Sequence, residues 1–88
     1  MPRILYADHP LALLSLQHAL AEHFDVHATS RMEEAKTILE QGVDLIICGL
    51  YFDDPDVVTF IEMCAQDERT ARIPLVCVRV WEHAGRAG

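Results

Sequence analysis

Val43-Asp44-Leu45-Ile46-Ile47-Cys48-Gly49-Leu50 is the stretch that decides the fold of this chain. It is the most continuous apolar run in the sequence, and its eight residues match the length of a strand and fall short of a typical helix. A strand that is apolar on both faces is typical of the middle of a parallel sheet, where helices cover both sides. We therefore expect residues 43–50 to be a central parallel strand.

Three further segments have the character of strands. Residues 4–7 are apolar and end in the turn Asp8-His9-Pro10, and residues 75–80 are apolar on both faces apart from Arg79 near the end. Residues 25–29 alternate between polar and apolar side chains, as in a strand at the edge of a sheet. The sequence therefore predicts four strands.

The segments between these strands have the 3.6-residue period of helices that pack one face on a sheet. The first runs from Leu11 to about His23, the second from Arg31 to Gln41, and the third from Pro55 to about Asp67. Strands and helices thus alternate along the whole chain. This order predicts an α/β fold with a doubly wound parallel sheet.

Capping residues mark where two of these helices begin or end. Ser30 and Glu33 have the spacing of a capping box, and Gly42 can adopt the left-handed conformation that ends the second helix. Before the third helix, Asp54 is a candidate N-cap, with Pro55 at the first helical position. These residues predict that the helices begin close to residues 31 and 55.

Length and charge limit the class of protein. The 88 residues, 51% of them hydrophobic, suffice for one domain, which we expect at residues 1–80 with a flexible tail at residues 81–88. The net charge of -7 disfavours nucleic acid or an anionic membrane surface as the main partner. No stretch approaches the roughly 18 apolar residues of a membrane span, and the N-terminus lacks the pattern of a signal peptide. We therefore expect a cytoplasmic protein.

Cysteines and histidines lack the spacings that are typical of metal or catalytic sites. Cys48, Cys64 and Cys77 form no CxxC pair, and we expect them to be reduced core residues. His18 and His23 are five residues apart, which misses the i, i+4 spacing that places two imidazoles on one helix face. The sequence also has no Ser-His-Asp arrangement, P-loop or GxGxxG motif, so we do not expect an enzyme.

Three segments together resemble the response-regulator receiver domain over nearly the whole chain. They are Arg3-Ile4-Leu5-Tyr6-Ala7-Asp8-His9-Pro10, Val43 to Leu50, and Ile73-Pro74-Leu75-Val76-Cys77-Val78-Arg79-Val80. The resemblance implies the flavodoxin-like receiver fold, whose strands have the order 2-1-3-4-5. Because the sequence stops soon after the fourth predicted strand, we expect a sheet truncated after strand 4, in the order 2-1-3-4.

The resemblance also implies a phosphorylation site, which this chain has lost. In the family, an aspartate at the end of strand three accepts a phosphoryl group from a histidine kinase, and an acidic pair after strand one holds Mg²⁺. The acceptor position falls on Gly49, which has no oxygen nucleophile. Of the acidic pair, only Asp8 remains, in Asp8-His9 or Ala7-Asp8 depending on the alignment. Asp8 is thus a weak Mg²⁺ candidate, and we otherwise expect no cofactor.

His9, Asp53 and Arg79 join Asp8 in this region by the same resemblance. Asp8, His9 and Asp53 form a residual acidic pocket, while Arg79 stands at the switch position that a Thr or Ser normally occupies. The Arg79 guanidinium could pair with Asp8 or Asp53 and hold the pocket in one state, or it could reach solvent while its stem covers apolar surface. Asp8 itself could simply cap the turn and the first helix. Asp53 or Asp54 could act as a displaced phosphoryl acceptor, although a loop carboxylate lacks fixed in-line geometry.

The fourth strand is expected to be an edge with unpaired backbone groups. The candidate interaction edge consists of Leu75, Val76, Cys77, Val78, Val80 and Trp81. We expect a homodimer through this edge, or contact with a protein partner such as a histidine kinase or an output domain.

The sequence as a whole predicts a non-phosphorylatable receiver-like signalling domain of the two-component, or phosphorelay, type, acting by protein–protein interaction. Two alternatives remain open. One is a receiver that a histidine kinase phosphorylates on a displaced aspartate, Asp53 or Asp8. The other is a small-ligand binding α/β domain that uses a pocket above Gly49.

Overall fold

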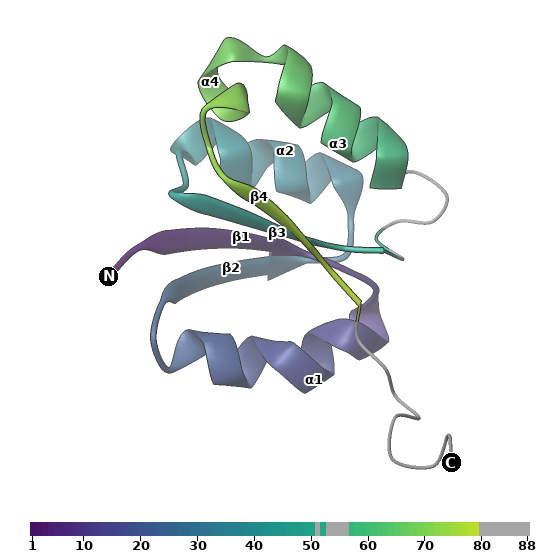
Figure 1. Cartoon of the computed structure of the whole chain (residues 1–88). Helices are drawn as coiled ribbons and strands as arrows, with labels where there is room; N and C mark the ends of the chain where they lie inside the picture. The colour runs from purple at the N-terminus through teal and green to yellow at the C-terminus, as the bar shows by residue number, and fades with distance from the viewer. Residues whose placement is uncertain (51, 53–56, 80–88) are drawn as a thin grey trace.

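The computed structural model describes residues 1–50, 52 and 57–79, and its centre is a four-stranded parallel sheet (Figure 1). The strand order is β2-β1-β3-β4, so β1 and β3 are central and β2 and β4 lie at the two edges. This confirms the predicted α/β fold and the predicted strand order 2-1-3-4. Within the described residues, β4 is the last strand of the sheet. The strands are β1 at Arg3–Ala7, β2 at Asp25–Thr29, β3 at Leu45–Gly49 and β4 at Leu75–Val78.

Helices cover the two faces of the sheet unequally. Among the described residues, α1 lies on one face, whereas α2, α3 and the short α4 lie on the other face (Figure 1). The helices are α1 at Pro10–Ala21, α2 at Met32–Gln41, α3 at Val57–Gln66 and α4 at Glu68–Ala71. No helix in the described part of the chain is long and apolar enough to cross a membrane.

The core has two parts, one on each side of the sheet. On the α2 and α3 side, alternate residues of β1 and β3 pack against Phe52 and Phe60, whose rings meet edge to face with centroids 5.1 Å apart. On the α1 side, Ile4, Tyr6 and Ile47 are the buried residues. This two-sided burial is the reason that residues 45–49 form a continuous apolar run.

The predicted capping box at the start of α2 is wrong. The N-cap is Arg31 rather than Ser30, and Arg31 makes no side-chain capping hydrogen bond. Instead, the Arg31 amide donates to the Thr29 hydroxyl oxygen at 3.0 Å, which prolongs the turn after β2 by one residue. At the other end of α2, Gly42 is the C-cap and has a positive φ of +90°, which suits glycine, but its ψ of 129° lies outside the left-handed helical region that was predicted.

Two further helix predictions differ from the structure. The first helix ends at Ala21 rather than near His23, and the four-residue helix α4 follows α3 without having been predicted. Such a short helix has too few residues to show a period. The predicted start of the third helix at Asp54 and Pro55, and the tail at residues 81–88, lie outside the described residues.

Candidate functional site

Gly49 is the last residue of β3, at the carboxyl edge of the sheet where parallel α/β folds place their sites. It is buried between the ends of the neighbouring strands, and its Cα partner in β4 is Val78. On the other side, β1 and β3 are aligned with Ala7 opposite Cys48. The next residue of the β1 segment, Asp8, therefore comes to lie beside Gly49.

The carboxyl group of Asp8 fills the space that a side chain at position 49 would need. A Cβ built on Gly49 would overlap with the Asp8 carboxyl carbon and both of its oxygens. Asp8 is only 2% exposed. The Asp8 carboxyl group thus lies directly beside Gly49.

Two hydrogen bonds hold the Asp8 carboxylate in this position. The Tyr6 hydroxyl donates to Oδ2 at 2.8 Å, and the His9 backbone amide donates to Oδ1 at 2.7 Å. Burial, the hydrogen bond to Asp8 and the charge of Asp8 all raise the pKa of the Tyr6 hydroxyl above its usual range. Each oxygen of this buried carboxylate therefore accepts a bond from the protein, as a buried charge requires.

Tyr6 is the residue of this site that the sequence analysis missed. It precedes Asp8 by two positions, so in an extended chain both side chains point to the same face. That spacing was the available signal. The hydroxyl lies in the core beneath α1, where it needs a partner, and Asp8 supplies one.

His9 caps the first helix. It is the N-cap of α1, and its Nδ1 accepts the Leu11 amide at 3.1 Å. The hypothesis that Asp8 caps this helix is therefore wrong, although Asp8 does accept the His9 amide in the preceding turn. Pro10 follows at the first helical position, where its missing N–H is not needed.

The donor set around Asp8 does not fit the Mg²⁺ ion that the receiver resemblance implies. Mg²⁺ takes about six oxygen ligands, mostly carboxylates and waters. Here both oxygens of the Asp8 carboxylate already accept hydrogen bonds, and the group is almost completely buried. Within residues 1–50, 52 and 57–79, no three His, Cys, Asp or Glu side chains converge to hold a metal.

The other predicted site residues are distributed as follows. Arg79 directly follows β4 and is exposed. Asp53 and Asp54, like Val80 and Trp81 of the candidate edge, lie outside the described residues, so the predicted pairing of Arg79 with Asp53 is untested.

The β4 edge presents alternate backbone groups outward. The amides of Ile46 and Leu50 bond the carbonyls of Pro74 and Val78, so these even-numbered residues of the β4 segment face β3. In a parallel strand the intervening residues, Leu75 and Cys77, direct their N–H and C=O groups away from β3. In the part of the chain that the structure describes, β3 is the only neighbour of β4.

The three cysteines differ in environment. Burial is the main cause that raises the pKa of Cys48 to about 12 and that of Cys64 to about 11. Both are core thiols, as predicted. Cys77 is exposed, so the expectation that it is a core residue is wrong, because β4 is an edge strand with a partly uncovered surface.

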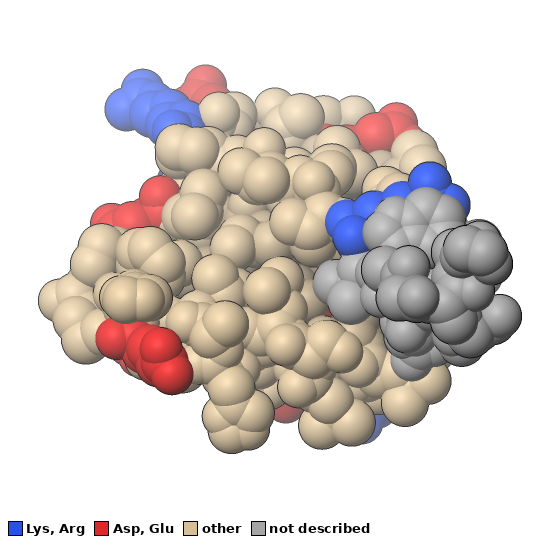
Figure 2. Space-filling model, turned by 60° about the horizontal axis from the view of Figure 1, so that its bottom comes forward, with Lys and Arg blue, Asp and Glu red and all other residues tan. Residues whose placement is uncertain are grey.

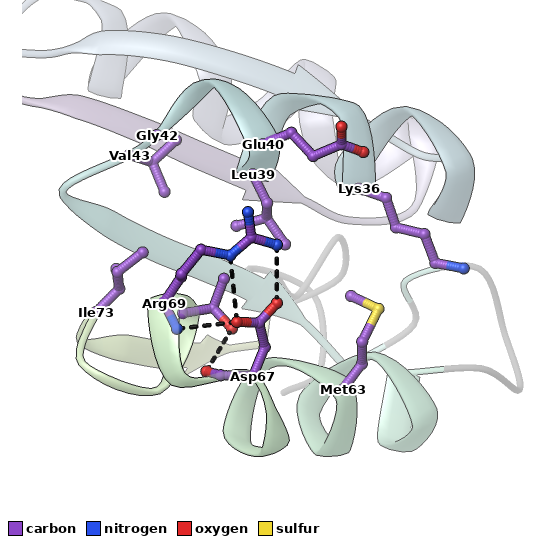
Figure 3. A pocket seen from close by; sticks show the side chains of 10 residues that line it. Lys36, Leu39, Glu40, Gly42, Val43, Met63, Asp67, Arg69 and Ile73 are labelled. Atoms are coloured by element: carbon purple, nitrogen blue, oxygen red, sulfur yellow. Dashed lines mark hydrogen bonds and ion pairs between the residues drawn. The ribbon is translucent and has the colours of Figure 1, made fainter.

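A cleft of about 460 Å³ lies at the opposite end of the sheet, near the amino ends of β3 and β4. No sequence pattern predicted this cleft. Its apolar lining comes from residues such as Leu39, Val43 and Met63, and the facing Asp67 and Arg69 side chains form an ion pair of 3.2 Å beside it (Figure 3). The remaining lining residues are Lys36, Glu40, Gly42, Thr70 and Ile73.

None of the protein-family models matches this chain, and a search of the curated proteins finds no similar sequence.

Proposed function

We propose that this chain is a non-phosphorylatable receiver-like signalling domain of the two-component type, which acts by protein–protein interaction. The observation that carries the proposal is the position of the Asp8 carboxylate above Gly49. The family comes from the sequence resemblance alone, and the Asp8 position supports the absence of phosphoryl transfer at Gly49.

Phosphoryl transfer requires an oxygen nucleophile that is open to the phosphodonor and in line with the leaving group. Gly49 has no such oxygen. Asp8 has two, but both accept hydrogen bonds from the protein and the side chain is buried. These contacts argue against Asp8 as a displaced acceptor.

A domain that phosphate does not switch either holds one conformation or switches by partner binding alone. The net charge of -7 favours a basic partner surface, and a histidine kinase or an output domain would be such a partner in this class of signalling. The outward groups of Leu75 and Cys77 supply a template for strand addition, by a partner or by a second copy in a homodimer.

The test of the closed site is incubation with acetyl phosphate and Mg²⁺, followed by intact mass measurement. We expect no phosphoryl adduct on the wild-type chain. We also expect none on Gly49→Asp, because the new carboxylate would compete with Asp8 for one space. A stable adduct on Asp8, Asp53 or Asp54 of the wild-type chain would favour the displaced-acceptor alternative.

The test of the β4 edge is Cys77→Pro. Proline removes one outward N–H donor, and edge strands tolerate it because that donor does not serve β3. If β4 adds a strand in a homodimer, the variant should remain folded and lose association in sedimentation equilibrium. Association equal to that of the wild type would contradict the edge homodimer.

The cleft of Figure 3 favours a second candidate function, the binding of a small ligand. It combines apolar lining with a few charged groups, as ligand sites do. A thermal-shift screen of metabolites tests it, with Ile73→Trp as the variant that fills the cleft. A ligand that stabilises the wild type and not Ile73→Trp would support the site. Equal stabilisation of both would place the ligand elsewhere.

A further inference from the structure

Cys48 and Cys77 lie side by side on neighbouring strands. In the parallel register of β3 and β4, Cys48 is the Cα partner of Cys77. Neighbouring strands of a sheet are about 4.8 Å apart, and the two Cα atoms of a disulfide are usually about 4.4–6.8 Å apart. The backbones at these two positions are therefore within the distance that a disulfide bridges.

Both side chains also point to the same face of the sheet. Cys48 belongs to the core on the α2 and α3 side. On β4, Leu75 packs against that same core, whereas Val78 packs against the core on the α1 side. Alternate residues of a strand point to one face, so Cys77 shares the face of Leu75 and Cys48. The pair thus meets the requirement for side-chain direction as well as that for distance.

The two thiols differ in their access to solvent. Cys77 is exposed, whereas Cys48 is completely buried. A small reagent in solution therefore reaches Cys77 first. An accessible thiol beside a second thiol is the arrangement that allows the second sulfur to resolve an oxidised form of the first.

We propose that Cys48 and Cys77 form a site of reversible oxidation, at which a low-molecular-weight disulfide converts the two thiols into a bond between β3 and β4. In the first step, the Cys77 thiolate attacks one sulfur of the reagent, and the other sulfur leaves as a thiolate. In the second step, the Cys48 thiol gives its proton to solvent, and its sulfur attacks the Cys77 sulfur and releases the second reagent thiolate. The two cysteines together lose two electrons and two protons, and the reagent becomes two thiols.

The environment of Cys48 makes the second step slow. Burial is the main cause that raises the pKa of Cys48 to about 12, and the nearby Cys77, Asp8 and Cys64 add to this effect. Cys48 is therefore almost entirely protonated near neutral pH. Below its pKa the thiolate fraction rises about tenfold for each pH unit, and the thiolate is the attacking form. We expect a mixed disulfide that forms rapidly on Cys77 and closes slowly at neutral pH.

The strand geometry makes the bond easy to reduce. Side chains that leave neighbouring strands in the same direction keep their Cβ atoms about 4.8 Å apart, whereas a disulfide needs about 3.5–4.5 Å. Strand β4 must therefore shift toward β3 by a few tenths of an ångström. It has room to do so because, in the part of the chain that the structure describes, β3 is its only neighbour. A strained disulfide is more readily reduced, so an excess of a small thiol should reverse the oxidation.

The charge of the chain favours an uncharged reagent. The net charge of -7 repels anions. On the face that Figure 2 shows, Lys and Arg side chains are scattered near the rim and form no single basic patch that would offset this repulsion. Hydroxyethyl disulfide, which is small and neutral, is therefore the probe. The oxidation site does not depend on the signalling role proposed above.

The test is incubation of the folded chain with hydroxyethyl disulfide, followed by removal of the excess reagent and intact mass measurement. The first product should be a mixed disulfide on Cys77, which should convert into a chain that has lost only two hydrogen atoms. The rate of this conversion should rise about tenfold for each pH unit between about pH 7 and about pH 9. Digestion after Arg and Glu residues should place the link between the peptides that contain Cys48 and Cys77, and dithiothreitol should restore both thiols.

Cys64→Ala is the matched control, because it removes a buried thiol of the same core that does not belong to the pair. It should close like the wild type. Cys48→Ala should stop at the mixed disulfide, and Cys77→Ser should form no adduct rapidly. Circular dichroism should show that the variants remain folded, and the exposed position of Cys77 keeps Cys77→Ser informative if Cys48→Ala does not fold. The proposal is overturned by a mixed disulfide that persists at about pH 9, by a link that maps to Cys64, or by a link between two chains.

Discussion

The carboxyl group of Asp8 lies over Gly49, in the volume that any side chain at position 49 would occupy. The two positions are 41 residues apart in sequence, and the parallel register of β1 and β3 brings them together. The buried position of Asp8 therefore requires a residue without a side chain at position 49, which is a glycine.

Gly49→Ala tests this relationship most directly. The new methyl group would displace the Asp8 carboxylate from its hydrogen bonds, so we expect the free energy of unfolding to fall by about 1–3 kcal/mol, the usual range for an overpacked core. Urea unfolding of Gly49→Ala, of Asp8→Ala and of the double variant measures the effect. In the double variant the clash is absent, so the two losses should be less than additive. Strict additivity would contradict the direct contact.

Tyr6→Phe should destabilise the chain by removing the donor to Asp8 Oδ2. A hydrogen bond to a charged group contributes about 1.5–3 kcal/mol, and the buried carboxylate would be left with one partner. Chemical unfolding of the variant measures the loss. In an Asp8→Asn background the same substitution should have a smaller effect, because the partner is then neutral. An equal effect in both backgrounds would assign the loss to packing.

Alkaline pH should destabilise the chain through Tyr6. The folded structure raises the pKa of this hydroxyl above its usual value of about 10. The unfolded chain therefore releases the proton at lower pH than the folded chain, so stability is full below about pH 10 and falls as the pH rises beyond it. The difference in unfolding free energy between wild type and Tyr6→Phe should shrink over this range. A difference that stays constant with pH would contradict the assignment.

Thiol labelling should separate the three cysteines. Cys48 and Cys64 are buried and have raised pKa values, so neither exposes a thiolate near neutral pH, whereas Cys77 is exposed. We expect an aromatic disulfide reagent to titrate one thiol rapidly at neutral pH and three after denaturation. Cys77→Ser should abolish the rapid phase. Rapid loss of two thiols in the native chain would show that the core around Cys48 or Cys64 opens readily.

Much of the fold follows from local sequence patterns. The apolar run at residues 43–50 correctly predicts the central strand β3, and the alternation at residues 25–29 correctly predicts the edge strand β2. The features that were missed depend on longer-range geometry. The exposure of Cys77 follows from the place of β4 in the sheet, and the cover over Gly49 follows from strand register. Neither feature can be predicted from the residues that are adjacent in sequence.

The candidate site was only partly predictable for the same reason. The loss of the acceptor oxygen at Gly49 can be seen in the sequence. The Asp8 side chain points inward rather than toward solvent because the buried Tyr6 hydroxyl needs a hydrogen-bond acceptor. The shift of the α2 cap from Ser30 to Arg31 is a smaller case, in which the Thr29 hydroxyl accepts the Arg31 amide in the turn before the helix.

The strand order β2-β1-β3-β4 also bears on how the chain acquires its structure. The strand that is synthesised first, β1, is central, and both of its neighbours, β2 and β3, are complete once residue 49 has been synthesised. Strand β4 then pairs with the free edge of β3. Parallel pairing of this kind needs long-range contacts and is slow to form. Until residues 75–78 arrive, the apolar edge of β3 is uncovered, so a stalled or shortened chain would expose its most aggregation-prone strand.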